Sequence, residues 1–133
     1  MIVADTNLIA YLLIRGQYTG EAEAVYRKDP QWSAPVLWRS EFRNVLVFYL
    51  RRGLIGIDEA LETMEQAERL MRGQEFEVES SRVLRLAAGA GCSAYDCEFV
   101  ALAQDLNLPL ITSDSALISR FKPTVVSMRA FCA

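Results

Sequence analysis

Four acidic residues have no basic residue nearby in the sequence that is placed to pair with their charge. Asp5 and Asp114 each follow a short apolar run, whereas Glu41 and Asp96 lie within helical patterns. On a helix, the neighbours of Glu41 and Asp96 at three and four positions are apolar or neutral, and none is Lys or Arg. A carboxylate facing a core without a partner must be neutralised, paired from elsewhere or bound to a metal ion.

Each acid also has a purely structural interpretation. Asp5 and Asp114 are placed to cap the helices that follow them, since Asp is among the best N-cap residues. Ser93 and Asp96 have the spacing of a capping box. Glu98 also lacks a cation at helical spacing and is a further candidate for the site.

The chemistry open to this chain is narrowed by the absence of histidine. Ser-His-Asp and Cys-His triads are excluded, as is any zinc site that needs an imidazole. Carboxylates that converge supply hard oxygen ligands for Mg²⁺ or Mn²⁺, which bind substrate phosphates. Two carboxylates about 4 Å apart repel by about 4 kcal/mol at an effective dielectric of 20, a cost that a divalent ion removes. Metal-dependent phosphodiester hydrolysis follows from this set.

Short apolar segments alternate with amphipathic ones along the whole chain. We expect strands at 2–4, 32–34, 76–78, 109–112 and 124–126, and helices at 8–14, 21–28, 35–52, 58–72, 80–90, 93–106 and 115–121. Such alternation predicts an α/β fold, a three-layer sandwich with a short central parallel sheet flanked by helices. With 133 residues, the chain is expected to form one domain over 1–133. The ligand site of such a sheet lies beyond the carboxyl ends of its strands, where Asp5 and Asp114 fall.

Four segments together carry a resemblance to a known family. They are Asp5-Thr6-Asn7, Ser40-Glu41-Phe42, residues 95–103 beginning Tyr95-Asp96, and residues 110–114 ending Thr112-Ser113-Asp114. In order and spacing, they resemble the PIN-domain family, and with the chain length they resemble its VapC-type toxins. The resemblance implies a Mg²⁺- or Mn²⁺-dependent ribonuclease that acts on RNA, commonly as a homodimer, and is inhibited by a cognate antitoxin protein.

The same resemblance assigns roles to individual residues. Asp5, Glu41, Asp96 and Asp114 match the acidic quartet of the family, which is both catalytic and metal-binding, while Asn7 and Thr112 match its supporting polar residues. Many relatives have a further acid two positions after the fourth, where this chain has Ala116. That difference leaves the number of bound metal ions open.

Two other classes of function are compatible with parts of the pattern. A haloacid-dehalogenase-like phosphatase also places a nucleophilic Asp after its first strand, but its usual second Asp is Asn7 here. A third class, the receiver domain, does not fit, because it would need a phospho-acceptor Asp after a middle strand and none is found. A catalytically inert binding module of the same fold would use the acids only as helix caps.

Composition bears on partners and location. The net charge is -3, which argues against a protein that coats duplex nucleic acid, and 12 of the 14 cationic residues are Arg. The cysteines Cys92, Cys97 and Cys132 form no C-x-x-C pair, so a thiolate metal site is not indicated and a reducing cytoplasm is expected. We expect no signal peptide and no membrane span, because the longest apolar run has six residues, 45–50.

The segment 36–50 carries more apolar residues than one buried stripe needs. One face of this helix can pack on the sheet, and the remainder is either buried in its own chain or contacts a second subunit or a bound segment. The family resemblance favours contact, because it implies an antitoxin segment in a groove beside this helix. We expect Trp38, Phe42 and neighbouring apolar residues to contribute to that groove.

Overall fold

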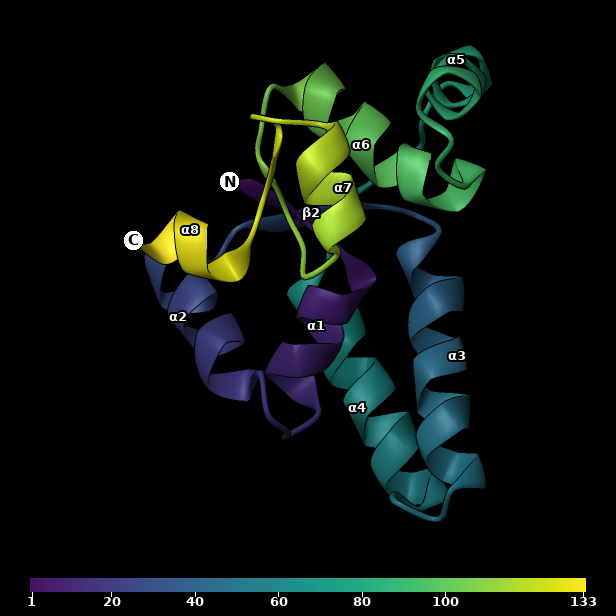
Figure 1. Ribbon diagram of the computed structural model, residues 1–133. Helices are drawn as coiled ribbons and strands as arrows, with labels where there is room; N and C mark the ends of the chain where they lie inside the picture. Colours follow the sequence, from purple (N-terminus) through teal and green to yellow (C-terminus); the bar gives the residue numbers. More distant parts are fainter.

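Five short strands form one parallel sheet at the centre of the computed structural model, which describes residues 1–133 (Figure 1). The strand order is β3-β2-β1-β4-β5, so the N-terminal strand occupies the middle of the sheet. The strands are β1 (Ile2–Ala4), β2 (Trp32–Pro35), β3 (Glu75–Phe76), β4 (Leu110–Ile111) and β5 (Val125–Val126). All neighbouring pairs are parallel, with Val3 facing Ser33 on one side and Leu110 on the other.

Eight helices surround this sheet. They are α1 (Thr6–Leu13), α2 (Thr19–Lys28), α3 (Trp38–Arg51), α4 (Ile57–Leu70), α5 (Ser80–Ala90), α6 (Ala94–Leu106), α7 (Ser115–Arg120) and α8 (Met128–Cys132). Helix α6 lies against β1, β2 and β4, while α1 covers the opposite face and packs on α2, α3 and α4. The chain therefore forms the predicted three layers, with α3 and α4 projecting as a hairpin at one side (Figure 1).

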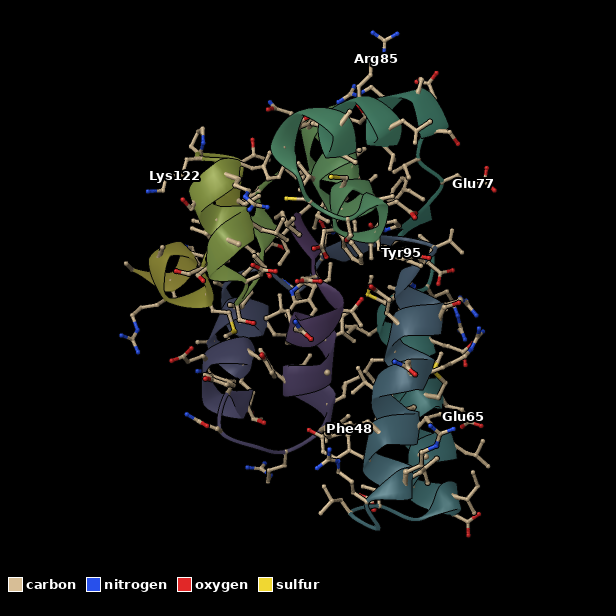
Figure 2. The ribbon with its side chains drawn as sticks, turned by 45° about the vertical axis from the view of Figure 1, so that its right-hand side comes forward. Phe48, Glu65, Glu77, Arg85, Tyr95 and Lys122 are labelled. Atoms are coloured by element: carbon tan, nitrogen blue, oxygen red, sulfur yellow. The ribbon has the colours of Figure 1, made fainter.

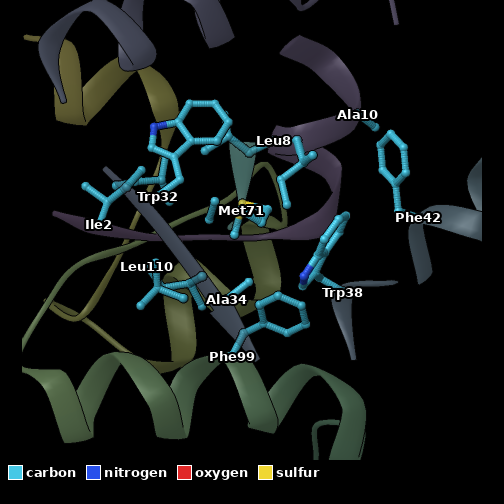
Figure 3. Packing of buried hydrophobic residues seen from close by; sticks show 14 of the residues in the cluster. Ile2, Leu8, Ala10, Trp32, Ala34, Trp38, Phe42, Met71, Phe99 and Leu110 are labelled. Atoms are coloured by element: carbon cyan, nitrogen blue, oxygen red, sulfur yellow. The ribbon is translucent and has the colours of Figure 1, made fainter. Parts of the chain in front are cut away.

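The core fills the space on both faces of the central strand. Buried Phe99 of α6 lies on one side, and Leu8 of α1 and Met71 at the end of α4 lie on the other (Figure 3). Strand β1 is covered on both faces, and all three of its residues are buried. This explains why Ile2–Ala4 is uniformly apolar and does not alternate with polar residues. The side chain of Asp5, directly after this strand, is thereby held at the edge of the core.

The predicted helix 35–52 begins later than the sequence indicates. Pro35 belongs to β2, where the backbone N–H groups of Ala34 and Val36 on either side of it donate to Gln74 and Phe76. The pairing of β2 with β1 ends at Ser33, so Pro35, whose missing N–H would face β1, lies beyond that pairing at the end of the strand. Helix α3 then starts at Trp38, which leaves Glu41 in its first turn.

An ion-pair network fixes the start of α3 against β3. The Glu75 carboxylate accepts hydrogen bonds from Trp38 Nε1 and Arg39 Nε, each at 2.6 Å, and Arg39 also pairs with Glu68 at 2.8 Å. Hydrogen bonding to Arg39, aided by Trp38, lowers the pKa of Glu75 despite its partial burial. This network sets the direction in which the first turn of α3 presents Glu41.

The apolar excess of α3 is distributed differently from the prediction. Trp38 and Phe42 are fully buried in the core of their own chain, so the expectation that they line a docking groove is wrong. Val36, before the helix, and Phe48, in its second half, are the large apolar residues left exposed there, at 45% and 49%. Trp38 and Phe42 are buried because α3 packs against α1 and α4, and both side chains belong to the central hydrophobic cluster.

Two smaller differences concern the ends of the chain and of the sheet. The third strand pairs at Glu75–Phe76 instead of 76–78, and a short C-terminal helix, α8, follows β5 where none was predicted. Ser127 caps that helix through the backbone N–H of Ala130. None of the eight helices combines the length and apolar character that a membrane span requires.

Candidate acidic active site

The four predicted acids come from four different elements that meet at the carboxyl edge of the sheet. Asp5 follows β1, and Asp114 follows the neighbouring strand β4. Glu41 and Asp96 lie in the first turns of α3 and α6. The parallel pairing of β1 with β4 brings residues 5 and 114 together across more than 100 positions of sequence.

A chain of hydrogen bonds links the ends of the two central strands. The Thr112 hydroxyl donates to Asp5 Oδ2 at 2.6 Å and accepts from the backbone N–H of Asp114 at 3.1 Å. Thr112 itself is fully buried, and its backbone is held by a hydrogen bond to Val126 of β5. Thr112 therefore fixes the orientation of the Asp5 carboxylate, in agreement with a supporting role.

Thr6 is a second positioning residue, and it is not among the site residues predicted from the sequence. Its backbone N–H donates to Asp5 Oδ1 at 2.8 Å, and its hydroxyl donates to Glu41 Oε1 at 2.7 Å. Thr6 thus ties together the acids of β1 and α3. The signal available in the sequence is its place directly after Asp5, at the first residue of a helix that starts at the sheet edge.

The environment of Asp5 disfavours its charged form. Burial raises the pKa of Asp5, and the negative charges of Asp96 and Asp114 raise it further, while the hydrogen bonds from Thr112 and Thr6 oppose the shift. The pKa of Asp5 is raised although two hydrogen bonds stabilise its charged form. Burial and the repulsion by neighbouring acids therefore destabilise the charged form more than these hydrogen bonds stabilise it. The three acids Asp5, Asp96 and Asp114 therefore share one electrostatic environment.

Glu41 and Asp96 show the same pattern. Burial raises the pKa of Glu41, the Thr6 hydroxyl opposes this, and Asp5, Asp96 and Glu98 add repulsion. Burial also raises the pKa of Asp96, with a contribution from Asp114 and an opposing one from the Ser93 hydroxyl. Glu98, whose own pKa is raised by burial, thus lies near enough to act on Glu41.

No salt bridge neutralises this cluster. None of the residues Asp5, Glu41, Asp96, Glu98 and Asp114 takes part in any of the six salt bridges of the structure. Repelling carboxylates without Lys or Arg are the donor chemistry that a divalent cation satisfies, so the residue types fit Mg²⁺ or Mn²⁺. The side chains are not grouped as ligands of a single ion, since no three acidic side chains lie close enough together to hold one.

The capping interpretations are confirmed for Asp5 and Asp114. Asp114 Oδ1 accepts from the backbone N–H groups of Ala116 and Leu117 at the start of α7. Ser93 caps α6 through the N–H of Asp96, but no bond returns from the Ser93 N–H to the Asp96 carboxylate, so the capping box is only half formed. Capping therefore uses one oxygen of Asp114 and leaves the Asp96 carboxylate available for another partner.

The remaining predicted residues lie at the rim. Asn7 is exposed on the first turn of α1 and forms no side-chain hydrogen bond. The position two residues after Asp114 is Ala116, which is exposed on α7 and supplies no further acid. Tyr95, 62% exposed, lies between the beginning of α6 and the beginning of α3, beside Asp96 (Figure 2). A shallow cavity of about 350 Å³ includes Thr112 and Ser113 in its lining.

Comparison with known proteins gives a consistent family match. The model of the PIN domain matches residues 2–122. Ribonuclease VapC3 of Pyrobaculum aerophilum is 28% identical over 127 residues, which cover 93% of this chain and 97% of that protein.

Solved structures share the fold at lower identity. The crystal structure of PAE2754 from Pyrobaculum aerophilum has a TM-score of 0.77 at 18% identity and covers 98% of this chain and 85% of that one. A toxin-antitoxin complex from Klebsiella pneumoniae has a TM-score of 0.71 at 21% identity, covering 96% of this chain and 98% of that one.

Proposed function

Since the chain belongs to the PIN-domain family, we propose that it is an endoribonuclease whose acidic cluster holds Mg²⁺ or Mn²⁺ and hydrolyses phosphodiester bonds of RNA. The name of the similar ribonuclease VapC3 supports the reaction class, and the match covers nearly the full length of both proteins. The observation that supports the metal dependence is the group of mutually repelling carboxylates that form no salt bridge.

Asp5, Glu41, Asp96 and Asp114 are the proposed metal ligands and catalytic residues. When bound, the ion would neutralise substrate phosphate and activate a water for attack on phosphorus. Thr112 and Thr6 hold the carboxylates of Asp5 and Glu41 in fixed orientations. Asn7, exposed at the rim, is proposed to donate to a phosphate oxygen of the substrate.

The proposed biological setting is a toxin-antitoxin pair in the cytoplasm, with the protein as a homodimer and a small antitoxin as its inhibitor. One structural neighbour is itself a toxin-antitoxin complex. An apolar surface suited to such contacts lies at the α3–α4 hairpin, where Leu54, Ile57 and Leu61 are each more than half exposed. Of these three, Leu54 also lines a cavity of about 440 Å³ that Leu13, at the end of α1, helps to form.

The subunit arrangement is tested by mass in solution. Light scattering of the purified chain is expected to give twice 15.0 kDa, and Leu61→Lys, which places a charge on the exposed apolar surface of α4, is expected to shift the mass toward the monomer. Glu62→Lys, the neighbouring exposed position, serves as the control for an added charge alone. A strictly monomeric wild type would contradict the homodimer.

Cleavage itself is tested with purified protein free of any partner. We expect RNA to be cut internally in the presence of Mg²⁺ or Mn²⁺ and to remain intact in excess chelator, as read from labelled transcripts on denaturing gels. RNA that stays intact with either metal would contradict the proposal and favour the inert binding module. Phosphate trapped covalently on Asp5 would instead favour the phosphatase mechanism.

A further inference from the structure

Two of the three cysteines meet at the turn that starts helix α6. Helix α5 ends at Gly91, whose φ of 70° is the left-handed conformation that glycine adopts without strain. Cys92 follows, and Ser93 is the N-cap of α6, which makes Cys97 the fourth residue of the helix. The residue before an N-cap and the fourth helical residue are the pair whose side chains pack as a hydrophobic staple. Here both members of that pair are thiols.

The packing of these side chains agrees with that geometry. Cys92 is half-buried and packs against the small cluster of Val83, Cys97 and Ala101, in which Cys97 is fully buried. Of the two thiols, only that of Cys92 is open to solvent.

Arg120 of α7 holds the exposed member of the pair. Its Nη1 donates to Cys92 Sγ at 3.2 Å and to the Gly91 carbonyl at 3.5 Å. A guanidinium beside a partly exposed sulfur is the environment in which thiols react with oxidants. Cys97 behind it is placed to act as the resolving thiol.

We propose that Cys92 and Cys97 are a modification site that forms a reversible intramolecular disulfide on exposure to a peroxide. The Cys92 sulfur attacks one peroxide oxygen and the O–O bond breaks, which gives a sulfenic acid on Cys92 and one water that carries away the thiol proton. The Cys97 sulfur then attacks the sulfenic sulfur, the S–O bond breaks, and the leaving hydroxide takes the Cys97 proton as a second water. The two thiols lose two electrons in total, and the peroxide gains them.

The crosslink would enclose residues 93–96, which include Asp96 and its capping Ser93. It would also alter the Cys92 sulfur to which Arg120 of α7, the helix capped by Asp114, donates. Oxidation thus changes the segment that contains Asp96 and a side-chain contact of the helix that Asp114 caps. The formation of the disulfide itself depends on neither metal nor RNA.

The sequence makes the test direct. No Lys or Arg lies between Arg85 and Arg120, so trypsin releases Cys92 and Cys97 together in peptide 86–120, while Cys132 falls in a separate peptide. After treatment of the folded, full-length protein with one equivalent of hydrogen peroxide, we expect peptide 86–120 to be about 2 Da lighter and resistant to alkylation. Dithiothreitol is expected to restore both of its thiols.

Matched serine variants separate this pair from the third cysteine. Cys92→Ser replaces a half-buried thiol and is expected to abolish the 2 Da loss, whereas Cys132→Ser, at an exposed position, is expected to retain it. Three results would overturn the proposal: both cysteines of peptide 86–120 alkylated after peroxide, oxygen added to Cys92 without a crosslink, or a disulfide that includes Cys132.

Discussion

Replacing Asp5 by asparagine is expected to lower the rate of metal-dependent RNA cleavage by at least about 100-fold, because loss of residues that only support metal ligands already costs about 10–100-fold. Asp5 lies at the centre of the cluster, with Thr112 on one oxygen and the Thr6 N–H on the other. Asparagine keeps the size and one acceptor oxygen but removes the negative charge. The rate is measured from the initial cleavage of a labelled RNA at saturating Mg²⁺ or Mn²⁺.

Asp105→Asn is the control for this substitution. Asp105 lies in the last turns of α6, pairs with Arg82 and makes no contact with the acidic cluster. Its replacement is expected to leave the rate within about twofold of wild type, since surface changes of this kind cost little. If Asp5→Asn cuts RNA at the wild-type rate, Asp5 is not a metal ligand and the proposed active site is wrong.

The second prediction concerns the stability of the metal-free protein. In chelator at neutral pH, Asp96→Asn is expected to unfold at a temperature no lower than wild type, because the change removes a partly buried charge that Asp114 repels. Added Mg²⁺ is expected to stabilise the wild type by about 2.7 kcal/mol at 100 times the dissociation constant, and the variant by less. Thermal unfolding with and without Mg²⁺ measures both effects.

The same raised pKa values give a pH dependence of defined sign. Asp5, Glu41 and Asp96 bind protons more tightly in the folded chain than in the unfolded chain. Their contribution to stability is therefore largest below the ordinary carboxyl pKa of about 4 and is lost as the pH rises through the raised folded values. In chelator, the free energy of unfolding of wild type relative to Asp96→Asn should fall with rising pH over this range.

That comparison isolates the contribution of Asp96. Glu75 and Asp29 have lowered pKa values and act in the opposite direction, but both proteins contain them, so their effects cancel in the difference. A difference that does not change with pH would contradict the raised pKa of Asp96. Equal stabilisation of both proteins by Mg²⁺ would place the metal ion away from Asp96.

The fold class could be predicted because the strands are short, apolar and regularly separated. Ile2–Ala4 and Leu110–Ile111 are covered on both faces, so each is an uninterrupted apolar run that ends at a polar residue. The element boundaries were harder. Pro35 is compatible with either a helix start or a strand end, and only the pairing of β2 with β3, forty residues further along, decides between them.

The acidic candidates could be recognised in the sequence because no cation is placed to pair with them. The lack of a pairing cation is also the reason that they repel one another in the fold. Glu41 and Asp96 lack a cation on their own helices, and the fold supplies none from elsewhere. The hydrogen bond from Thr6 to Glu41 could not be predicted from the sequence, because it joins positions that are 35 residues apart. The burial of Trp38 and Phe42 could not be predicted, because nothing in the sequence shows that α1 and α4 pack against α3.

The place of β1 in the middle of the sheet has a consequence for synthesis on the ribosome. The carboxylate of Asp5 and the hydroxyl of Thr112 that orients it are separated by 107 residues. At about 5–20 residues per second, Asp5 is made roughly 5–20 s before its partner. A nascent chain that has reached Leu106 contains Asp5, Glu41 and Asp96 but neither β4 nor Asp114, so its central strand still lacks a neighbour. If the protein cuts RNA as proposed, the translating ribosome and its message are not exposed to the finished active site until β4 and Asp114 have been made.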